Sequence, residues 1–286
     1  MPALPLLVVQ HELDDPPGRL GTWLEDAGVP LDVRTPFDGG TLPADLDRHA
    51  GLLVLGGAAA AHDDAVAPWL PEVRRLLSAA VQGEVPTFAI CLGAQLLAVA
   101  TGGRVERGAA GPELGAQLIA KRATAVTDPL FGPMPITPDV IQWHYDAIVA
   151  LPPAAVLLAS SPVYDVQAFR VGRLAWGLQG HIETTPELAR RWAETDPTLI
   201  EYDLSKLLAR MDDAHVYIEQ AWRPVAQRFA EVLADPSSVR PRSGPNVVTA
   251  APVEDPAAIR AALAMQMQSA RMPMQFGPPP AADGEP

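Results

Sequence analysis

The stretch from Pro86 to Arg107, PTFAICLGAQLLAVATGGRVER, constrains the fold of this chain more than any other. A short apolar run, residues 87–90, precedes Cys91, and the apolar residues after Cys91 recur at helical spacing until Gly102 ends the pattern. We therefore predict a buried strand, a sharp turn at Cys91 and a helix that begins directly after it. Gly93 supplies the small residue that such a turn needs.

Cys91 is the only cysteine in the 286 residues. A thiol on a strand-to-helix turn lies at a helix N-terminus, where the partial positive charge favours the reactive thiolate. A single cysteine is nevertheless more often a small buried apolar residue. The pattern makes Cys91 a candidate nucleophile, and the assignment depends on whether partners for proton transfer follow in the sequence.

A candidate partner lies in the segment RLAWGLQGHIETTPE, residues 173–187. The apolar run 174–178 predicts another buried strand, and His181 and Glu183 follow its carboxyl end. The carboxylate can hydrogen-bond one ring nitrogen, which leaves the other nitrogen free to accept a thiol proton. Because the carboxyl ends of parallel strands meet at one sheet edge, we expect Cys91, His181 and Glu183 to converge there. This arrangement suits cysteine-dependent acyl transfer.

Two motifs together resemble those of the class I glutamine amidotransferases, in particular the stand-alone proteins similar to the amidotransferase half of GMP synthetase. They are AICLGAQLLA around Cys91 and GLQGHIE around His181, and the resemblance covers residues 4–192. It implies a catalytic triad of Cys91, His181 and Glu183. The triad would release ammonia from glutamine through a γ-glutamyl thioester and pass the ammonia to a separate synthase. The sequence shows no CxxC motif, no cluster of histidines and no phosphate-binding loop, so no cofactor and no metal ion are expected.

The same resemblance assigns further residues to the site. A glycine pair, Gly56 and Gly57, ends the predicted strand 51–57. By resemblance, the backbone N–H of Gly57 is one donor of an oxyanion hole, with Gly56 as support, and the N–H of Leu92 is the second. Each such donor lowers the barrier by about 3 kcal/mol. Gln95 is implied to position glutamine from the helix that follows Cys91.

The segment QWHYD, residues 142–146, corresponds by resemblance to a His-Gly-Asp element whose backbone helps hold the α-amino and α-carboxylate groups of glutamine. Trp143, His144 and Tyr145 are therefore implied to bind substrate. Tyr145 stands where glycine is usual, and because tyrosine tolerates a positive φ poorly, we expect a reshaped loop. His144 is a weaker candidate base than His181, which has an orienting carboxylate.

Strand and helix patterns alternate along the chain, as in α/β folds. We predict an open, doubly wound, flavodoxin-like sheet, mostly parallel and flanked by helices, over residues 1–192. A helical extension, residues 193–235, is expected to pack on it, and residues 236–286 form a Pro/Ala/Met-rich linker and a largely disordered tail. The polar residues after the first strand, His11, Glu12, Asp14 and Asp15, are interpreted as a solvated loop.

Composition excludes several classes of function. The formal net charge of −13 and the pI of about 4.8 argue against binding to nucleic acid or to an anionic membrane surface. No apolar run reaches transmembrane length, and the N-terminus lacks the pattern of a signal peptide. One cysteine permits no internal disulfide, so a cytoplasmic location is expected.

Two alternatives to a glutamine-hydrolysing amidotransferase remain open. The same triad could hydrolyse a γ-glutamyl peptide or amide without a synthase partner, and the small residues 58–61 favour a bulkier substrate. The chain could also be a non-catalytic binding protein, since Ala89, Gly180 and Ile182 differ from the commonest family residues. Residues 193–286 contain no ATP-binding motif, so any synthase is expected to be a separate chain.

Overall fold

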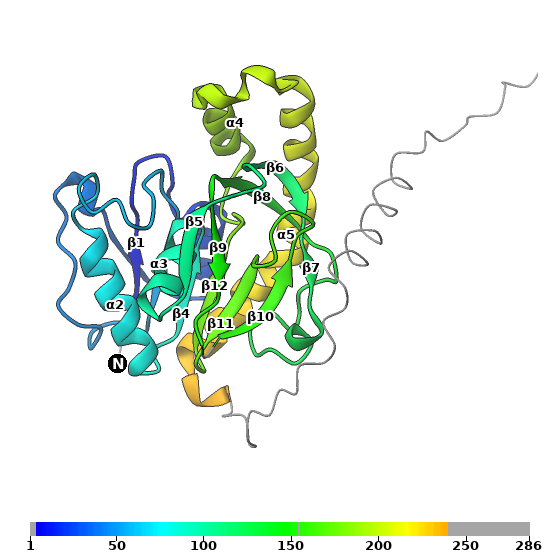
Figure 1. Cartoon of the computed structure of the whole chain (residues 1–286). Coiled ribbons are helices and arrows are strands. Elements are labelled where there is room, and N and C mark those ends of the chain that lie inside the picture. Colours follow the sequence, from blue (N-terminus) through cyan, green and yellow to red (C-terminus); the bar gives the residue numbers. More distant parts are fainter. Residues whose placement is uncertain (1–3, 154, 240–286) are drawn as a thin grey trace, which may run out of the picture. The chain divides into compact units, whose positions relative to one another are not determined.

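A computed structural model of the protein describes residues 4–153 and 155–239. Its central sheet has eight strands, of which β2, β1, β3, β4 and β12 run parallel in that order, and β11, β10 and β7 continue antiparallel (Figure 1). The strands are β1 (Leu6–Val9), β2 (Leu31–Arg34), β3 (Gly51–Val54), β4 (Thr87–Ile90), β7 (Ala120–Lys121), β10 (Ala155–Ser160), β11 (Ala168–Val171) and β12 (Ala175–Leu178).

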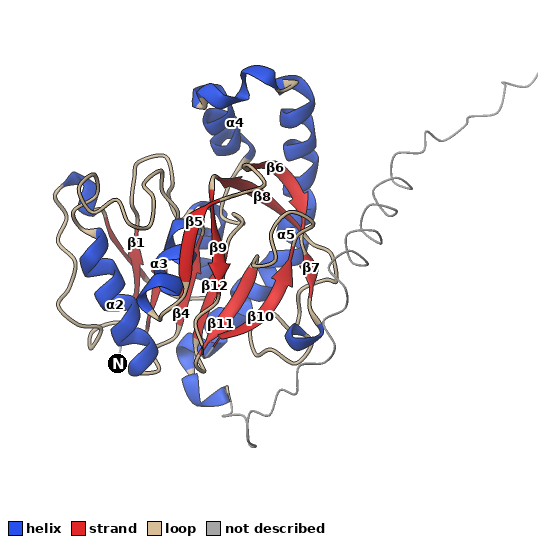
Figure 2. Cartoon of the chain, in the orientation of Figure 1, coloured by secondary structure: helices blue, strands red, loops and turns tan. Residues whose placement is uncertain are grey.

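Helices cover both faces of this sheet, as Figure 2 shows. Side chains of α1 (Gly18–Asp26) and α5 (Leu204–Ala234) share one buried apolar cluster, and those of α2 (Leu70–Gln82) and α3 (Leu92–Ala100) share another. Leu6 and Val8 of β1 belong to the first cluster and Leu7 and Val9 to the second. Because successive side chains of a strand point to opposite faces, the two clusters lie on opposite sides of the sheet. The predicted doubly wound α/β fold is confirmed.

Two smaller antiparallel sheets carry part of the site. β5 (Arg104–Arg107) pairs with β9 (Asp146–Ala150), and β6 (Glu113–Leu118) pairs with β8 (Asp139–His144). Sequence patterns indicated neither β5 nor β9, because both are short and largely lack alternation of apolar and polar residues. The predicted substrate-binding residues therefore lie at the turn from β8 into β9: Trp143 and His144 end β8, and Tyr145 separates the two strands.

The remaining helices follow β12. They are α4 (Pro186–Thr195), the short 3₁₀ helix η3 (Pro197–Glu201) and α5, and further 3₁₀ turns occur at Pro36–Asp38, Ala123–Ala125 and Pro236–Ser238. No helix among residues 4–153 and 155–239 is both long enough and apolar enough to cross a membrane. Of the predicted tail, residues 240–286 lie outside the described residues.

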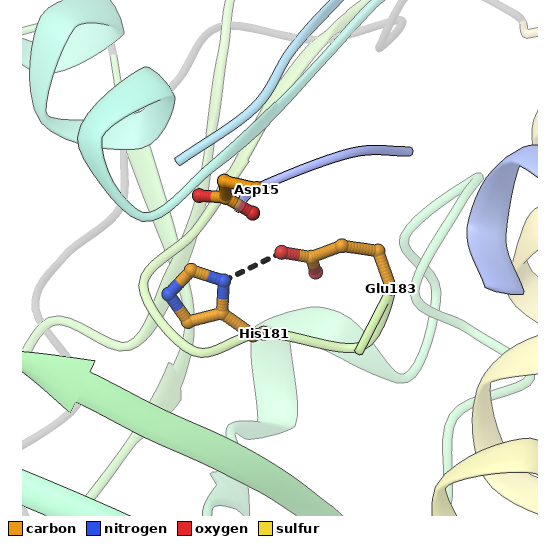
Figure 3. Close-up of side chains that lie close together, drawn as sticks. All are labelled: Asp15, His181 and Glu183. Atoms are coloured by element: carbon orange, nitrogen blue, oxygen red, sulfur yellow. Dashed lines mark hydrogen bonds and ion pairs between the residues drawn. The ribbon is translucent and has the colours of Figure 1, made fainter. Parts of the chain in front are cut away.

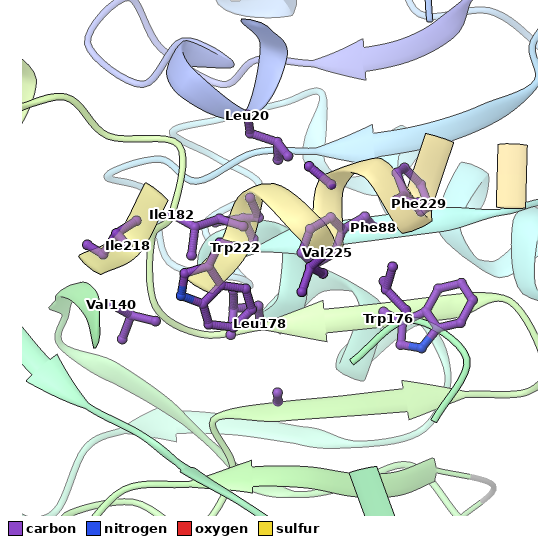
Figure 4. Close-up of a cluster of buried hydrophobic side chains, with 14 of the residues drawn as sticks. Leu20, Phe88, Val140, Trp176, Leu178, Ile182, Ile218, Trp222, Val225 and Phe229 are labelled. Atoms are coloured by element: carbon purple, nitrogen blue, oxygen red, sulfur yellow. The ribbon is translucent and has the colours of Figure 1, made fainter. Parts of the chain in front are cut away.

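α5 is one continuous helix of 31 residues with Pro224 inside it, where the sequence had left open one helix or two. Its aromatic side chains pack into the core beneath the sheet (Figure 4). The Phe229 ring lies 5.7 Å from that of Phe88, and the Trp222 ring lies 5.9 Å from that of Phe131. The indole N–H of Trp222 also donates to the carbonyl oxygen of Asp139 at 2.9 Å. Packing on both sides of Pro224 thus keeps the helix continuous.

We predict that α5 unfolds together with the sheet. Because Trp222 is fully buried, Trp222→Ala should lower the free energy of unfolding by about 3–5 kcal/mol. The matched control is Val216→Ala on the same helix, where the side chain is 58% exposed, and it should change stability by less than about 0.5 kcal/mol. Urea unfolding followed by circular dichroism measures both. A small effect of Trp222→Ala, or two separate transitions, would show that α5 folds independently.

Candidate active site

Cys91 occupies the turn between β4 and α3, as the sequence predicted. Its backbone has φ 49° and ψ −110°, a region that non-glycine residues rarely adopt. The Cys91 N–H donates to the carbonyl oxygen of Leu178 at 2.8 Å, which ties the turn to β12. A Cβ on Gly93 would lie 2.3 Å from the carbonyl oxygen of Val54, so only glycine lets α3 approach β3 this closely. The turn is a nucleophile elbow in geometry.

His181 and Glu183 follow β12, and both are buried. His181 Nδ1 lies 2.5 Å from Glu183 Oε1, and Glu183 Oε2 accepts a hydrogen bond from the N–H of Ile182 at 2.8 Å. Because Nδ1 is bound to the carboxylate, it carries a proton, and Nε2 is the nitrogen left for the thiol. The backbone of His181 forms an isolated bridge with Ile141 of β8, which fixes the position of the ring.

Charge and burial compete at the imidazole. Burial lowers the pKa of His181, but the negative charges of Glu183 and Cys91 outweigh it and hold this pKa well above its usual value. Burial raises the pKa of Glu183, whereas the His181 charge lowers it, and the net direction is downward. These opposite shifts favour an imidazolium at His181 paired with an ionised Glu183.

Helix α4 covers one side of the His181 imidazole. Trp192 of α4 packs edge-on against the His181 ring, with centroids 4.8 Å apart, and its indole N–H donates to the carbonyl oxygen of Asp14 at 2.8 Å. Thr185 caps α4 by accepting from the N–H of Leu188 at 3.2 Å. Trp192 therefore has a fixed position on one side of the candidate base.

The glycine pair after β3 lies against the same groups. A Cβ on Gly56 would come within 2.8 Å of the His181 ring, and one on Gly57 within 3.2 Å of the Leu92 side chain. Gly57 lines the pocket that contains Cys91, whereas the Leu92 side chain is buried in the core. Within the described part of the chain, the N–H groups of Gly57 and Leu92 donate to no backbone carbonyl. Both donors are therefore available to a ligand.

Gln95 lies in α3 one turn after Cys91 and is buried. Its Nε2 donates to the carbonyl oxygen of Asp146 at 3.1 Å and to Gln179 Oε1 at 3.3 Å. Gln179 Nε2 in turn lies 3.7 Å from the Cys91 sulfur. The Gln95 amide group thus joins the nucleophile helix to the loop between β8 and β9.

His144 uses both ring nitrogens within the protein. Nδ1 donates to the carbonyl oxygen of Asp146 at 2.8 Å, and Nε2 lies 2.9 Å from Glu113 Oε2. Glu113 is a buried carboxylate that the sequence motifs did not single out, and Gln167 and Ser161 also donate to it. With both nitrogens occupied, His144 supports the loop and is poorly placed to accept a proton from substrate.

Tyr145 does not have a positive φ, in line with the expectation that tyrosine avoids the conformation open to the glycine usual at this position. Among non-glycine residues in the described ranges, only Glu84 and Cys91 have positive φ. The Tyr145 hydroxyl donates to Asp196 Oδ2 at 2.7 Å, and the Arg107 guanidinium lies 4.6 Å from its ring centroid. The side chain therefore forms part of a wall, and the backbone needs no glycine here.

Asp196, the residue directly after α4, accepts hydrogen bonds from two aromatic side chains that line the pocket. Besides Tyr145, it accepts a hydrogen bond from Trp143 Nε1 at 3.1 Å. The resulting pocket has a volume of about 480 Å³. Its lining combines the thiol, the imidazole, small alanines and polar side chains from the surrounding loops: Glu12, Asp14, Asp15, Gly57, Ala58, Ala59, Ala60, Asp63, Cys91, Gln95, Arg107, Trp143, His144, Tyr145, Asp146, His181, Arg191, Trp192, Thr195 and Asp196.

The interpretation of residues 11–15 as a solvated loop is wrong for two of its members. His11 and Asp15 are 4% and 1% exposed, and Asp15 lies beside His181 and Glu183 (Figure 3). The available signal was their place directly after β1, since the carboxyl ends of β1, β4 and β12 meet at one edge.

Asp15, His181 and Glu183 form a group whose ligand atoms come within 4.8 Å of one another, a spacing that a metal ion could bridge. However, His181 Nδ1 and Glu183 Oε1 lie only 2.5 Å apart. A proton joins these two atoms at that distance, and it occupies the positions that a metal ion would need.

Comparison with known proteins agrees with the two sequence motifs. The sequence model of the family Glutamine amidotransferase class-I matches residues 28–193. Gamma-glutamyl peptidase 5 of Arabidopsis thaliana is 29% identical over 194 residues, which cover 65% of this chain and 74% of the relative. The glutamine-hydrolyzing GMP synthase of Halobacterium salinarum has a subunit that is 33% identical over 159 residues, covering 54% and 76% of the two chains.

Solved structures share the fold. A glutamine amidotransferase from Thermotoga maritima superposes with a TM-score of 0.72 at 27% identity, covering 80% of this chain and 98% of its own. A glutamine amido transferase from Methylobacillus flagellatus gives the same TM-score and identity and covers 80% and 95% of the two chains.

We predict that His11 makes the protein sensitive to acid. Burial lowers its pKa from 6.5 to about 4, and its Nδ1 accepts a hydrogen bond from Trp69 Nε1 at 3.0 Å. Between these two pH values the unfolded chain binds a proton that the folded chain does not, so stability falls as pH falls. From pH 7 to pH 5 this costs about 2 kcal/mol.

Urea unfolding at the two pH values tests this, with His11→Gln retaining an acceptor for Trp69. The stability difference between wild type and His11→Gln should change by about 2 kcal/mol between pH 7 and pH 5. The exposed His62 provides the control variant His62→Gln, for which that difference should stay constant. An equal acid response of wild type and His11→Gln would contradict the prediction.

Proposed function

The chain belongs to the class I glutamine amidotransferase family, and on this premise we propose that it hydrolyses a γ-glutamyl amide bond through Cys91. One observation carries the proposal. Cys91 and His181 line the same pocket, and Glu183 binds the far nitrogen of the imidazole at 2.5 Å. A thiol, a base and an orienting carboxylate are the parts that a cysteine-dependent acyl transfer needs.

In the first step the Cys91 proton moves to His181 Nε2, and the thiolate attacks the δ-carbonyl carbon of the substrate. The carbonyl oxygen becomes an oxyanion, and the free N–H groups of Gly57 and Leu92 donate to it. Collapse breaks the C–N bond, and the leaving nitrogen takes the proton from His181. Ammonia or an amine leaves, and a γ-glutamyl thioester remains on Cys91.

In the second step water attacks the thioester carbonyl. His181, neutral after the first step, accepts a proton from the water, and the sulfur leaves as the C–S bond breaks. The same proton returns to Cys91, and glutamate is released. Glu183 keeps Nδ1 protonated throughout and stabilises the imidazolium each time it forms.

The loop between β8 and β9 is the proposed cradle for the glutamyl group. Trp143, His144 and Tyr145 all line the pocket. Gln95 supports this cradle by holding the carbonyl oxygen of Asp146. The proposed role of Gly56 is steric: because it has no side chain, it leaves room for the imidazole of His181.

Glutamine is the first candidate substrate, with its ammonia passed to a separate synthase. The relative named as part of a glutamine-hydrolyzing GMP synthase supports this candidate. A bulkier γ-glutamyl peptide or amide is the second candidate. The pocket volume of about 480 Å³ and the alanines 58–60 at its rim favour it, and so does the similarity to a protein named gamma-glutamyl peptidase. The cytoplasmic location and the division at residues 192 and 235 remain predictions.

We predict that Cys91→Ala abolishes release of glutamate. Because the nucleophile is lost, kcat should fall by about 10⁴-fold or more for whichever substrate the wild type accepts. The assay measures glutamate from glutamine and, in parallel, from a γ-glutamyl dipeptide. Ala27→Leu, at an exposed position outside the pocket, is the control and should retain activity. Equal turnover by wild type and Cys91→Ala would refute the proposed function, and inactivity of the wild type on both substrates would favour a binding protein.

We predict that side chains at the rim of the pocket select substrates by the size of the leaving amine. Ala58 is exposed and lines the pocket, so Ala58→Leu narrows the pocket without disturbing the core. If the leaving amine passes this rim, kcat/KM should fall about 10-fold or more for a γ-glutamyl dipeptide and less than about 3-fold for glutamine. The ratio of the two kcat/KM values is the measurement. An unchanged ratio would remove Ala58 from the substrate path.

A further inference from the structure

Asp15 is a buried carboxyl group to which the proposed mechanism assigns no role. It lies in the loop between β1 and α1, it is 1% exposed, and its Oδ1 has no hydrogen-bond partner among the described residues. An ionised carboxylate buried without a partner costs several kcal/mol. A proton on Oδ1 would remove this cost, provided that an acceptor lies nearby.

The nearby acceptor is Glu183. Polar atoms of Asp15, Glu183 and His181 lie within 4.8 Å of one another. In Figure 3 the carboxyl group of Asp15 faces Glu183, and Glu183 in turn contacts His181. The two carboxyl groups therefore lie close to each other beside the imidazole.

Glycines allow this approach. A Cβ on Gly56 would lie 2.2 Å from Asp15 Oδ2, and a Cβ on Gly18 would lie 2.1 Å from the carbonyl oxygen of Glu183. The N–H of Arg19 donates to that same carbonyl at 2.8 Å. The backbone from β1 to α1 is thus held against the segment that carries the triad.

The surrounding charges favour one arrangement of protons in this pair. Burial raises the pKa of Asp15 well above its usual value, His181 lowers it, and Glu183 and Glu12 raise it further. Those three are the titratable groups that face Asp15. The pKa of Glu183 instead moves down, because the His181 charge outweighs burial. Both directions favour a neutral Asp15 beside an ionised Glu183.

We propose that Asp15 is a positioning residue: it keeps its proton and donates it as a hydrogen bond to Glu183, which fixes that carboxylate against His181 Nδ1. This inference rests on the proposed function for its effect on catalysis. The hydrogen-bond chain then runs from Asp15 through Glu183 to His181. Glu183 Oε2 also accepts from the N–H of Ile182, so the carboxylate has donors from three directions and little freedom to rotate.

Two substitutions separate this role from simple packing. Asp15→Asn has nearly the same shape and keeps a donor for Glu183, so kcat should stay within about 3-fold of wild type. Asp15→Ala removes the donor, and kcat should fall about 10- to 100-fold with little change in KM. The control is Asp38→Asn, an exposed carboxyl outside the pocket, which should leave the kinetics unchanged.

The pH profile adds a readout that a purely structural role would not affect. In wild type, loss of the Asp15 proton at alkaline pH turns a donor into a second anion beside Glu183, so kcat should fall there. Asp15→Asn cannot lose that proton and should keep its activity to higher pH. A loss of activity in Asp15→Asn equal to that of Asp15→Ala, or identical alkaline limbs in wild type and Asp15→Asn, would overturn the proposal.

An infrared measurement is independent of turnover. The difference spectrum between wild type and Asp15→Asn at pH 7 should contain the C=O stretch of a protonated carboxyl group, and the spectrum of Asp38→Asn should lack it. Absence of the band overturns the proposal even if the enzyme is active. If the band is present and Cys91→Ala turns over substrate like the wild type, the proposed function fails while the proton on Asp15 stands.

Discussion

The site depends on the turn at Cys91, where a side chain is held at φ 49°. Such a conformation costs about 1–3 kcal/mol and persists only where the surroundings fix it. Here the N–H of Cys91 is bound to β12 and Gly93 packs against the backbone of β3, so the two neighbouring strands hold the turn from either side. The same two contacts place the thiol between the glycine pair after β3 and the histidine after β12. The strained backbone of Cys91, the position of the proposed nucleophile and the proposed oxyanion donors therefore depend on the same contacts.

The second constraint is the burial of charge. His181 and Glu183 are almost completely buried, and an ion pair in such a place gains stability only when its hydrogen bonds are satisfied. The structure meets this condition with short contacts: the imidazole on Oε1, the Ile182 N–H on Oε2 and the carboxyl of Asp15 beside them. The favourable partner charges explain why the pKa of His181 rises although burial alone would lower it. A base held in the charged form beside a thiol favours the thiolate, which is the attacking species.

The sequence pattern predicted those strands and helices whose bounds are determined by residues close together in the chain. The strand before Cys91 and the helix after it have the predicted bounds, because apolar runs and a change of period mark them directly. The burial of His11 and Asp15 was missed, since a polar loop after a strand gives no local sign of later contacts. Trp69 contacts His11, and α4 and the His181 segment lie against the rest of the loop. Glu113 was missed for a similar reason: its partner His144 lies 31 residues away, and only the pairing of β6 with β8 brings them together.

The choice between glutamine and a larger substrate depends on the part of the chain that the two motifs do not reach. α4 supplies Trp192, which packs against Trp143, and is followed by Asp196, which hydrogen-bonds to Trp143 and Tyr145. These aromatic side chains line the pocket that contains the thiol. A single residue, Asp196, accepts from both Trp143 and Tyr145, so any shift of α4 moves both walls together. In the proposed mechanism the geometry of Cys91, His181 and Glu183 determines which bond is broken, because it fixes the attacking atom. In that mechanism, the aromatic side chains that line the pocket limit the size of the group attached to that bond. These side chains come from segments far apart in the sequence. On the proposed function, the substrate class therefore depends on tertiary packing around α4.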